Sequence, residues 1–116
     1  MAKILLFGLD RSVEDELDPV LTQLGQTVQT GTPSSGVLEH TDANVVFADG
    51  ATLSAVRGAR PELPVVVVSR IPEVSGWLDA LEAGASDYCG APFEAVQVRW
   101  VLESSLRAVT GHRFAA

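Results

Sequence analysis

The stretch Leu63-Pro-Val-Val-Val-Val-Ser69 decides the fold, because four consecutive valines stand between a proline and a serine. Two shorter apolar runs, Ile4–Phe7 and Val45–Ala48, precede it in the chain. An apolar run without polar alternation is typical of a strand that is buried on both faces. Such strands predict a parallel sheet that is covered by helices on both sides.

The segments between these runs have helical spacing or end in residues typical of turns. The expected strands are Ile4–Phe7, Thr27–Thr30, Val45–Ala48, Val65–Val68 and Asp87–Cys89, and the expected helices are 12–24, Pro33–His40, Leu53–Ala59, 74–83 and Phe93 to about Val109. This alternation predicts an α/β fold, a doubly wound five-stranded parallel sheet, for which the flavodoxin-like (βα)5 order 2-1-3-4-5 is the leading topology. We expect one domain over residues 1–109 and a fraying C-terminal tail over 110–116.

Two of the helices carry more detailed expectations. Ser12 is the expected N-cap of the first helix, with an acidic residue at the capping-box position. Pro19 lies inside the same helical pattern, which predicts a kink or a later helix start. After the fourth strand, Val74, Leu78 and Leu81 share the face that we expect to pack on the sheet.

The composition excludes several classes of partner. The 116 residues carry a formal net charge of -7 and show no cluster of Lys or Arg, whereas nucleic-acid binding needs a basic face. The longest apolar run is too short to span a bilayer, and no cleavage site follows the apolar N-terminus. The single cysteine fits a reducing compartment, so we expect a cytoplasmic protein without nucleic-acid or membrane partners.

In a parallel sheet of this kind, functional groups gather at the carboxyl ends of the strands. The residues expected at those ends are Gly8-Leu9-Asp10, Asp49-Gly50, Ser69-Arg70 and Gly90-Ala91-Pro92. No Ser-His-Asp set, paired catalytic carboxylates or phosphate-binding glycine loop can be assembled from the chain, so we expect no enzyme. His40 and His112 have no second ligand at metal spacing, and Cys89 is expected to be a buried hydrophobe.

Three motifs occur in the order and spacing of a known family. They are Ala80-Leu-Glu-Ala-Gly-Ala-Ser-Asp-Tyr88 followed by Ala91-Pro92-Phe93, Ala43-Asn-Val-Val-Phe-Ala-Asp49, and Leu63-Pro-Val-Val-Val-Val-Ser69. Together they resemble the receiver domain of response regulators in two-component signalling. The resemblance runs from Lys3 to about Arg107.

The resemblance implies a phosphorylation site that this chain has largely lost. Asp49 stands at the phospho-acceptor position and Ser69 at the position of the hydroxyl that binds the phosphate. The acidic pair that would hold Mg²⁺ falls on Gly8 and Leu9, with Asp10 one residue late, and the phosphate-binding lysine is replaced by the residue before Pro92, an alanine. A phosphoryl group there would meet no fixed positive charge, and each lost contact of this kind slows such chemistry by about two to three orders of magnitude.

The remaining site residues have simpler roles in this interpretation. We expect Asp49 to cap the turn or helix after its strand, and we do not expect Arg70 to replace the missing lysine at position Ala91. The resemblance further implies a cis peptide bond at Pro92, and it places Tyr88 at the switch position of the family. Without phosphate chemistry, we expect that tyrosine to be static and half-buried.

The last helix predicts an interaction surface. Val98, Val101, Leu102 and Val109 fall on the face expected to cover the sheet. Val96 and Trp100 project from the opposite face, and exposed tryptophans of this kind are frequent interface anchors. Trp77 is expected to extend the same surface.

Three functions stay open at this stage. The first is an atypical receiver domain in bacterial signal transduction that needs no phosphorylation or cofactor and acts through a protein partner or a homodimer. The second is an active receiver, phosphorylated on Asp49 by a histidine kinase with Mg²⁺. The third is a flavodoxin-like domain that senses a small ligand in the crevice beside Gly8 and Ala91. The sequence identifies neither the partner nor the oligomeric state.

Overall fold

The computed structural model describes the backbone of residues 2–70 and 74–115, and the side chains of residues 2–70 and 76–106. Its strands are β1 (Lys3–Phe7), β2 (Thr27–Gly31), β3 (Val45–Ala48), β4 (Val65–Ser69) and β5 (Asp87–Gly90), and its helices are α1 (Arg11–Gln23), α2 (Val37–His40), α3 (Leu53–Ala59), α4 (Val74–Glu82) and α5 (Ala95–Ala115). The strands form one parallel sheet in the order β2-β1-β3-β4-β5, which confirms the predicted topology.

Two apolar cores lie on opposite faces of this sheet. One face packs against α1 and α5 through residues such as Leu6, Leu17 and Val98, and the other packs against α2, α3 and α4 through residues such as Leu5 and Val56. Successive side chains of a strand point to opposite faces, so Leu5 and Leu6 supply different cores. This arrangement explains why the strands are apolar without alternation.

Helix α1 begins earlier than the sequence predicts. The N-cap is Asp10, whose backbone carbonyl accepts hydrogen bonds from the N–H groups of Val13 and Glu14, both at 3.0 Å. Ser12 lies within the first turn, and its hydroxyl donates a hydrogen bond to the Asp10 carboxylate, so the prediction of Ser12 as N-cap was wrong. The helix continues through Pro19, which also rules out a later start.

Helix α2 is shorter than predicted, because the residues before it form a turn. The Ser35 hydroxyl donates to the Thr32 carbonyl at 2.7 Å, and Gly36 then adopts a left-handed conformation with φ of 72°. Serine hydroxyls compete with helical hydrogen bonds in this way. Only Val37–His40 remains helical, instead of Pro33–His40.

The face of α4 that packs on the sheet differs from the predicted one. Leu78 is 50% exposed and Leu81 is also exposed, whereas Ala80 is 6% exposed and belongs to the core. The Tyr88 hydroxyl lies next to the backbone of Gly76, so the space between α4 and β5 favours short side chains. The third residue of the predicted face, Val74, has its side chain outside the described part of the chain.

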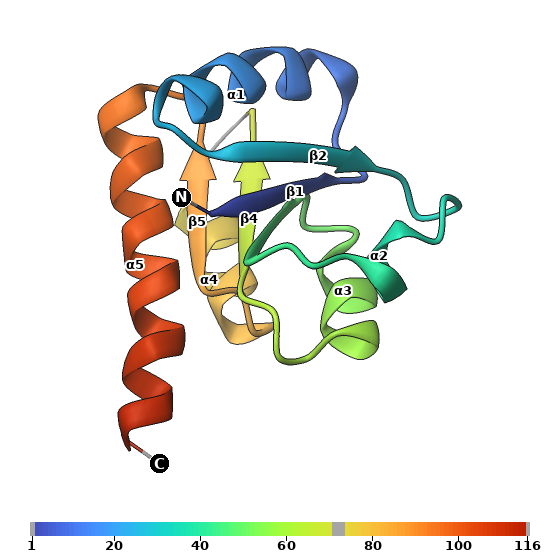
Figure 1. Cartoon of the computed structure of the whole chain (residues 1–116), viewed down its shortest axis with the longest axis vertical. Coiled ribbons are helices and arrows are strands. Elements are labelled where there is room, and N and C mark those ends of the chain that lie inside the picture. The colour runs from blue at the N-terminus through green and yellow to red at the C-terminus, as the bar shows by residue number, and fades with distance from the viewer. Residues whose placement is uncertain (1, 71–73, 116) are drawn as a thin grey trace.

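Helix α5 extends to Ala115, beyond the predicted end near Val109 (Figure 1). No proline interrupts this segment, and one glycine inside a helix costs only about 1 kcal/mol relative to alanine. The helical backbone therefore continues through residues 110–115, and the fraying of this tail stays a prediction. Within the described residues, no helix is long and apolar enough to cross a membrane.

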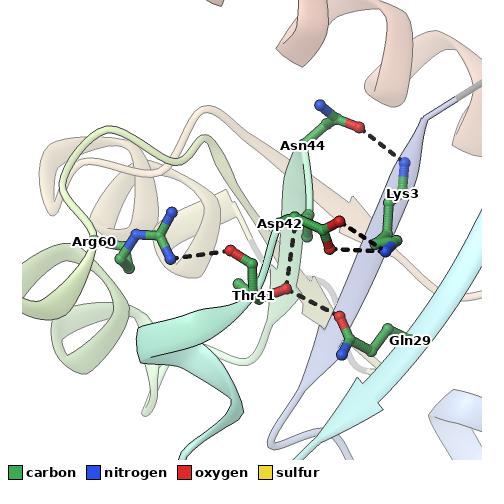
Figure 2. A network of polar contacts seen from close by, with 7 residues as sticks. Lys3, Gln29, Thr41, Asp42, Asn44 and Arg60 are labelled. Atoms are coloured by element: carbon green, nitrogen blue, oxygen red, sulfur yellow. Dashed lines mark hydrogen bonds and ion pairs between the residues drawn. The ribbon is translucent and has the colours of Figure 1, made fainter.

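Polar contacts secure the edge of the sheet where its strands begin (Figure 2). The Lys3 ammonium group forms an ion pair with Asp42 at 2.7 Å, and the Lys3 backbone N–H donates to the Asn44 side chain at 2.9 Å. The Arg60 guanidinium donates to the carbonyls of Leu38 and Thr41, both at 3.1 Å. These bonds attach the one-turn helix α2 and the start of β3 to their neighbours, at the edge opposite the candidate site.

Candidate functional site

A pocket of about 630 Å³ lies where the strands end, between the sheet and α4. Its lining includes apolar residues from several elements together with charged and hydroxyl groups: Leu9, Asp10, Val13, Asp49, Gly50, Leu53, Val67, Val68, Ser69, Arg70, Gly76, Asp79, Ala80, Ala83 and Tyr88. The fold thus brings Asp10, Asp49, Ser69 and Tyr88 to one crevice, as a parallel sheet requires. Gly8 and Ala91 are not among its lining residues, so the space lies closer to α4 than the sequence indicates.

Asp49 is half-buried at the end of β3, and its side chain is part of the following turn. Its Oδ1 atom accepts a hydrogen bond from the Thr52 backbone N–H at 2.9 Å and another from the Thr52 hydroxyl at 2.8 Å. Thr52 is the N-cap residue of α3. The carboxylate therefore organises the entry into that helix, which is the structural role predicted for it.

The positions of the missing acidic pair have no side-chain oxygen to offer a metal. Gly8 has no side chain and adopts a left-handed φ of 67°, and its N–H donates to the Gly31 carbonyl at 2.9 Å. Leu9 packs against the core on the α1 face. Asp10 does line the pocket, but its carboxylate accepts a hydrogen bond from the Ser12 hydroxyl.

The position of the missing lysine lies in the loop after β5. The backbone N–H of Ala91 donates to the Ser69 carbonyl at 2.9 Å, and its methyl group packs against the core. The peptide bond between Ala91 and Pro92 is cis, the geometry implied by the resemblance. This loop provides no cation to the crevice.

Arg70 has partners that the sequence did not indicate. Its guanidinium forms an ion pair with Glu16 at 2.8 Å and donates to the Ser12 hydroxyl at 3.2 Å. These bonds connect the end of β4 to the start of α1 at the rim of the pocket. The positive charge of Arg70 is therefore directed to α1 and is opposed by a carboxylate.

The two remaining side chains of interest on β5 are both buried to some degree. Tyr88 is half-buried, as predicted, and lines the pocket beside Gly76. Cys89 is fully buried, and burial, helped by the negative charge of Asp87, raises the pKa of its thiol to about 12. A thiol with this pKa stays protonated and unreactive near neutral pH.

The donor set at the crevice does not fit the Mg²⁺ ion that receiver domains use. Magnesium in proteins is usually bound through one or two carboxylates together with water in nearly octahedral geometry, and the side chains of Gly8 and Leu9 supply no carboxylate. Within the side chains that the structure describes, no group of three His, Cys, Asp or Glu residues could hold a metal ion. His40 belongs to this part of the chain, whereas His112 lies outside it.

A second feature lies on α5. Val96 and Trp100 are 76% and 64% exposed, and they line a groove of about 660 Å³ together with Pro92 and Gln97. Trp77 is also exposed, but it belongs to α4 on the other side of β5 and does not line this groove. Val98, Val101 and Leu102 are buried against the sheet as predicted, and the side chain of Val109 lies outside the described residues.

Comparison with known proteins identifies the fold. No family model and no curated protein matches the sequence. Among solved structures, NtrX from Brucella abortus superimposes with a TM-score of 0.85 at 24% identity over 98% of this chain. A CheY-like receiver domain protein from Methanospirillum hungatei superimposes with a TM-score of 0.80 at 19% identity, over 97% of this chain and 98% of that one. The chain has the fold of a response-regulator receiver domain.

This receiver fold accounts for nearly all of the chain, but only for part of some of the proteins that it resembles. The chain spans 29% of the NtrX structure. The beryllofluoride-activated NtrC4 receiver domain, a dimer in solution, matches with a TM-score of 0.77 at 15% identity over 94% of this chain and 99% of that one. In this fold Asp49 follows β3, Ser69 ends β4 and Pro92 follows β5.

Proposed function

We propose that this chain is a receiver-type signalling domain that works without phosphorylation and acts through contacts with another protein chain. One observation carries the proposal. The carboxylate at the phospho-acceptor position, Asp49, is bound by both the backbone and the hydroxyl of Thr52 and serves as a turn cap. The groups that would make it a phosphoryl acceptor are replaced by Gly8, Leu9 and Ala91.

Electrostatics disfavour a phosphate beside Asp49. An aspartyl phosphate would carry about two negative charges where the carboxylate carries one, near the carboxylates of Asp10 and Asp79, which also line the pocket. The guanidinium of Arg70 is paired with Glu16 and would have to break that ion pair to help. Each missing preorganised contact costs about two to three orders of magnitude in rate, so the combined loss removes useful phosphoryl transfer.

The surface around Trp100 is the part of the molecule that supports a protein contact. Trp100 and Val96 expose apolar side chains beside a groove, and the solvation of an exposed tryptophan is unfavourable in a monomer. Tryptophan is among the residues most enriched at the centres of protein interfaces. We propose a second copy of this chain as the occupant, because the structurally similar NtrC4 receiver domain is a dimer. Trp77 is proposed to lie at the margin of this contact.

The first experiment tests phosphorylation. The protein is incubated with acetyl phosphate and Mg²⁺, and intact mass is compared with that of Asp49→Asn. We expect no mass increase in either protein. In parallel, beryllofluoride with Mg²⁺ should leave the tryptophan fluorescence unchanged. A phosphate adduct that disappears in the Asp49 variant would instead support the active receiver and refute the proposal.

The second experiment tests the surface. Sedimentation equilibrium should show self-association that Trp100→Ala weakens by about 30-fold, since truncating a central interface tryptophan costs roughly 2 kcal/mol. Glu103→Gln is the matched control, because it changes an exposed neighbour on the same helix without removing apolar surface. A wild-type protein that stays monomeric, or equal weakening by both variants, would contradict dimerisation through this surface.

A further inference from the structure

The open pocket at the strand ends has the size of a small-molecule site. Its volume of about 630 Å³ falls within the range of 300–1,000 Å³ that is typical of ligand pockets. The space exists because α4 turns short side chains toward the sheet, with Gly76 and Ala80 inside, while its bulky residues Trp77 and Leu78 point to solvent. The cavity is therefore a consequence of how α4 is oriented.

The interior of the pocket is apolar. Leu53, Val67 and Ala80 provide its aliphatic wall, and each of them is buried in the core on the face of the sheet that α2, α3 and α4 cover. The half-buried ring of Tyr88 forms part of the same wall. A ligand with an apolar body would gain free energy by displacing water from these surfaces.

The charges around the pocket select the head group. Among the described lining residues are three carboxylates, those of Asp10, Asp49 and Asp79, and one guanidinium, that of Arg70. The guanidinium is offset by its ion pair with Glu16. The carboxylate of Asp79 makes no hydrogen bond or ion pair with the part of the chain that the structure describes. The excess negative charge repels anions and attracts cations.

We infer that this pocket binds a small organic cation in which an ammonium group is attached to an apolar body. The body lies against the aliphatic wall, and the ammonium group lies near the carboxylate of Asp79. An aromatic ring adds attraction for a cation that lies over its face, and Tyr88 is among the residues that line the pocket. This inference does not depend on the contact surface of α5. The ligand that it names is a cation, whereas a phosphate is an anion.

Benzylammonium, benzyl alcohol and benzoate form a matched set of probes, because they share an aromatic body and differ in charge. Titration of each into isotopically labelled protein should shift the amide NMR signals of Gly50 and Gly76, which line the pocket, and leave Gly58, an exposed glycine outside it, unchanged. We expect saturable binding that is tightest for benzylammonium and weakest for benzoate.

Two variants connect the binding to this pocket. Asp79→Asn should weaken benzylammonium binding by about fivefold, the upper end of what one exposed charge contact contributes, and should not change the binding of benzyl alcohol. Glu82→Gln is the control, because Glu82 is an exposed carboxylate on the same helix that does not line the pocket. Gly76→Leu, which fills the space beside Tyr88, should abolish the binding of all three probes.

Three results would overturn the inference. The first is the absence of saturable shifts with benzylammonium in the wild-type protein. The second is binding of benzoate that is as tight as that of benzylammonium. The third is equal weakening by Asp79→Asn and Glu82→Gln, which would indicate a general effect of net charge. A phosphate adduct on Asp49 in the separate mass experiment would refute the proposed function and leave this inference standing.

Discussion

Replacement of Asp49 by alanine should destabilise the protein, although an acidic residue in a working phosphorylation site is often a source of electrostatic strain. The substitution removes the acceptor of two hydrogen bonds, from the Thr52 N–H at 2.9 Å and from the Thr52 hydroxyl at 2.8 Å. Loss of a helix-entry cap costs about 0.5–2 kcal/mol, and hydrogen bonds to charged groups lie at the upper end of such ranges. The Thr52 N–H keeps its weaker bond to the Asp49 carbonyl at 3.2 Å. We therefore expect a loss of about 1–2 kcal/mol.

Urea unfolding monitored by circular dichroism measures this loss as a change in the free energy of unfolding at constant m-value. Asp49→Asn retains one carbonyl acceptor and should lose about half as much free energy. Thr52→Val removes the hydroxyl donor, and its effect should be smaller in the Asp49→Ala background, with a coupling of about 0.5–1 kcal/mol. If Asp49→Ala is as stable as the wild type or more stable, the capping role is refuted and Asp49 regains the character of a strained site residue.

Four further predictions follow from single positions. Gly8→Ala should lower the free energy of unfolding by about 1–2 kcal/mol in urea titrations, because its φ is 67° and a Cβ there would lie 3.1 Å from a threonine methyl group. Arg60→Ala should cost about 2 kcal/mol in the same assay, because two carbonyls at the end of α2 lose their donors, and Arg60→Lys should recover part of this loss. The pKa of the Cys89 thiol is raised from 9.0 to about 12. The protonated thiol therefore contributes fully to the stability of the folded protein below pH 9, and this contribution decreases as the pH rises from 9 toward 12. In melting experiments at increasing pH, Cys89→Ala should lose less stability than the wild type over that range. Ser105→Ala should leave thermal stability unchanged or raise it, because the buried hydroxyl has no hydrogen-bond partner among the described residues, and a clear decrease in melting temperature would reveal a missed partner.

The strands were predictable because their signal is local. Four consecutive valines, and the runs Ile4–Phe7 and Val45–Ala48, are too apolar to lie anywhere except between two layers of helices. The short fifth strand begins at the predicted residue, Asp87, and ends at Gly90, one residue later than predicted. Once five parallel strands were expected, the handedness of their connections left few topologies.

The helices were less predictable because their boundaries and faces depend on competing contacts. Asp10 instead of Ser12 became the N-cap of α1, since both residues are good caps and only the backbone path decides between them. On α4, hydrophobicity favoured Leu78 and Leu81 as the buried residues, yet Ala80 faces the sheet. The rotation of a helix about its axis is set by how closely it packs and by its connections, and neither is encoded in a periodic pattern.

The candidate site divides in the same way. The sequence alone determined that Asp49 and Ser69 would meet at the carboxyl edge of the sheet, and that the side chains of Gly8, Leu9 and Ala91 could supply neither a metal ligand nor a cation there. Strand order and residue type are sufficient for that conclusion, because parallel strands end at a common edge. Only the tertiary structure decided that Arg70 pairs with Glu16, that Asp49 caps α3 through Thr52, and that the pocket opens toward α4. These features depend on side-chain directions and on the orientation of one helix, which arise only when distant segments pack together.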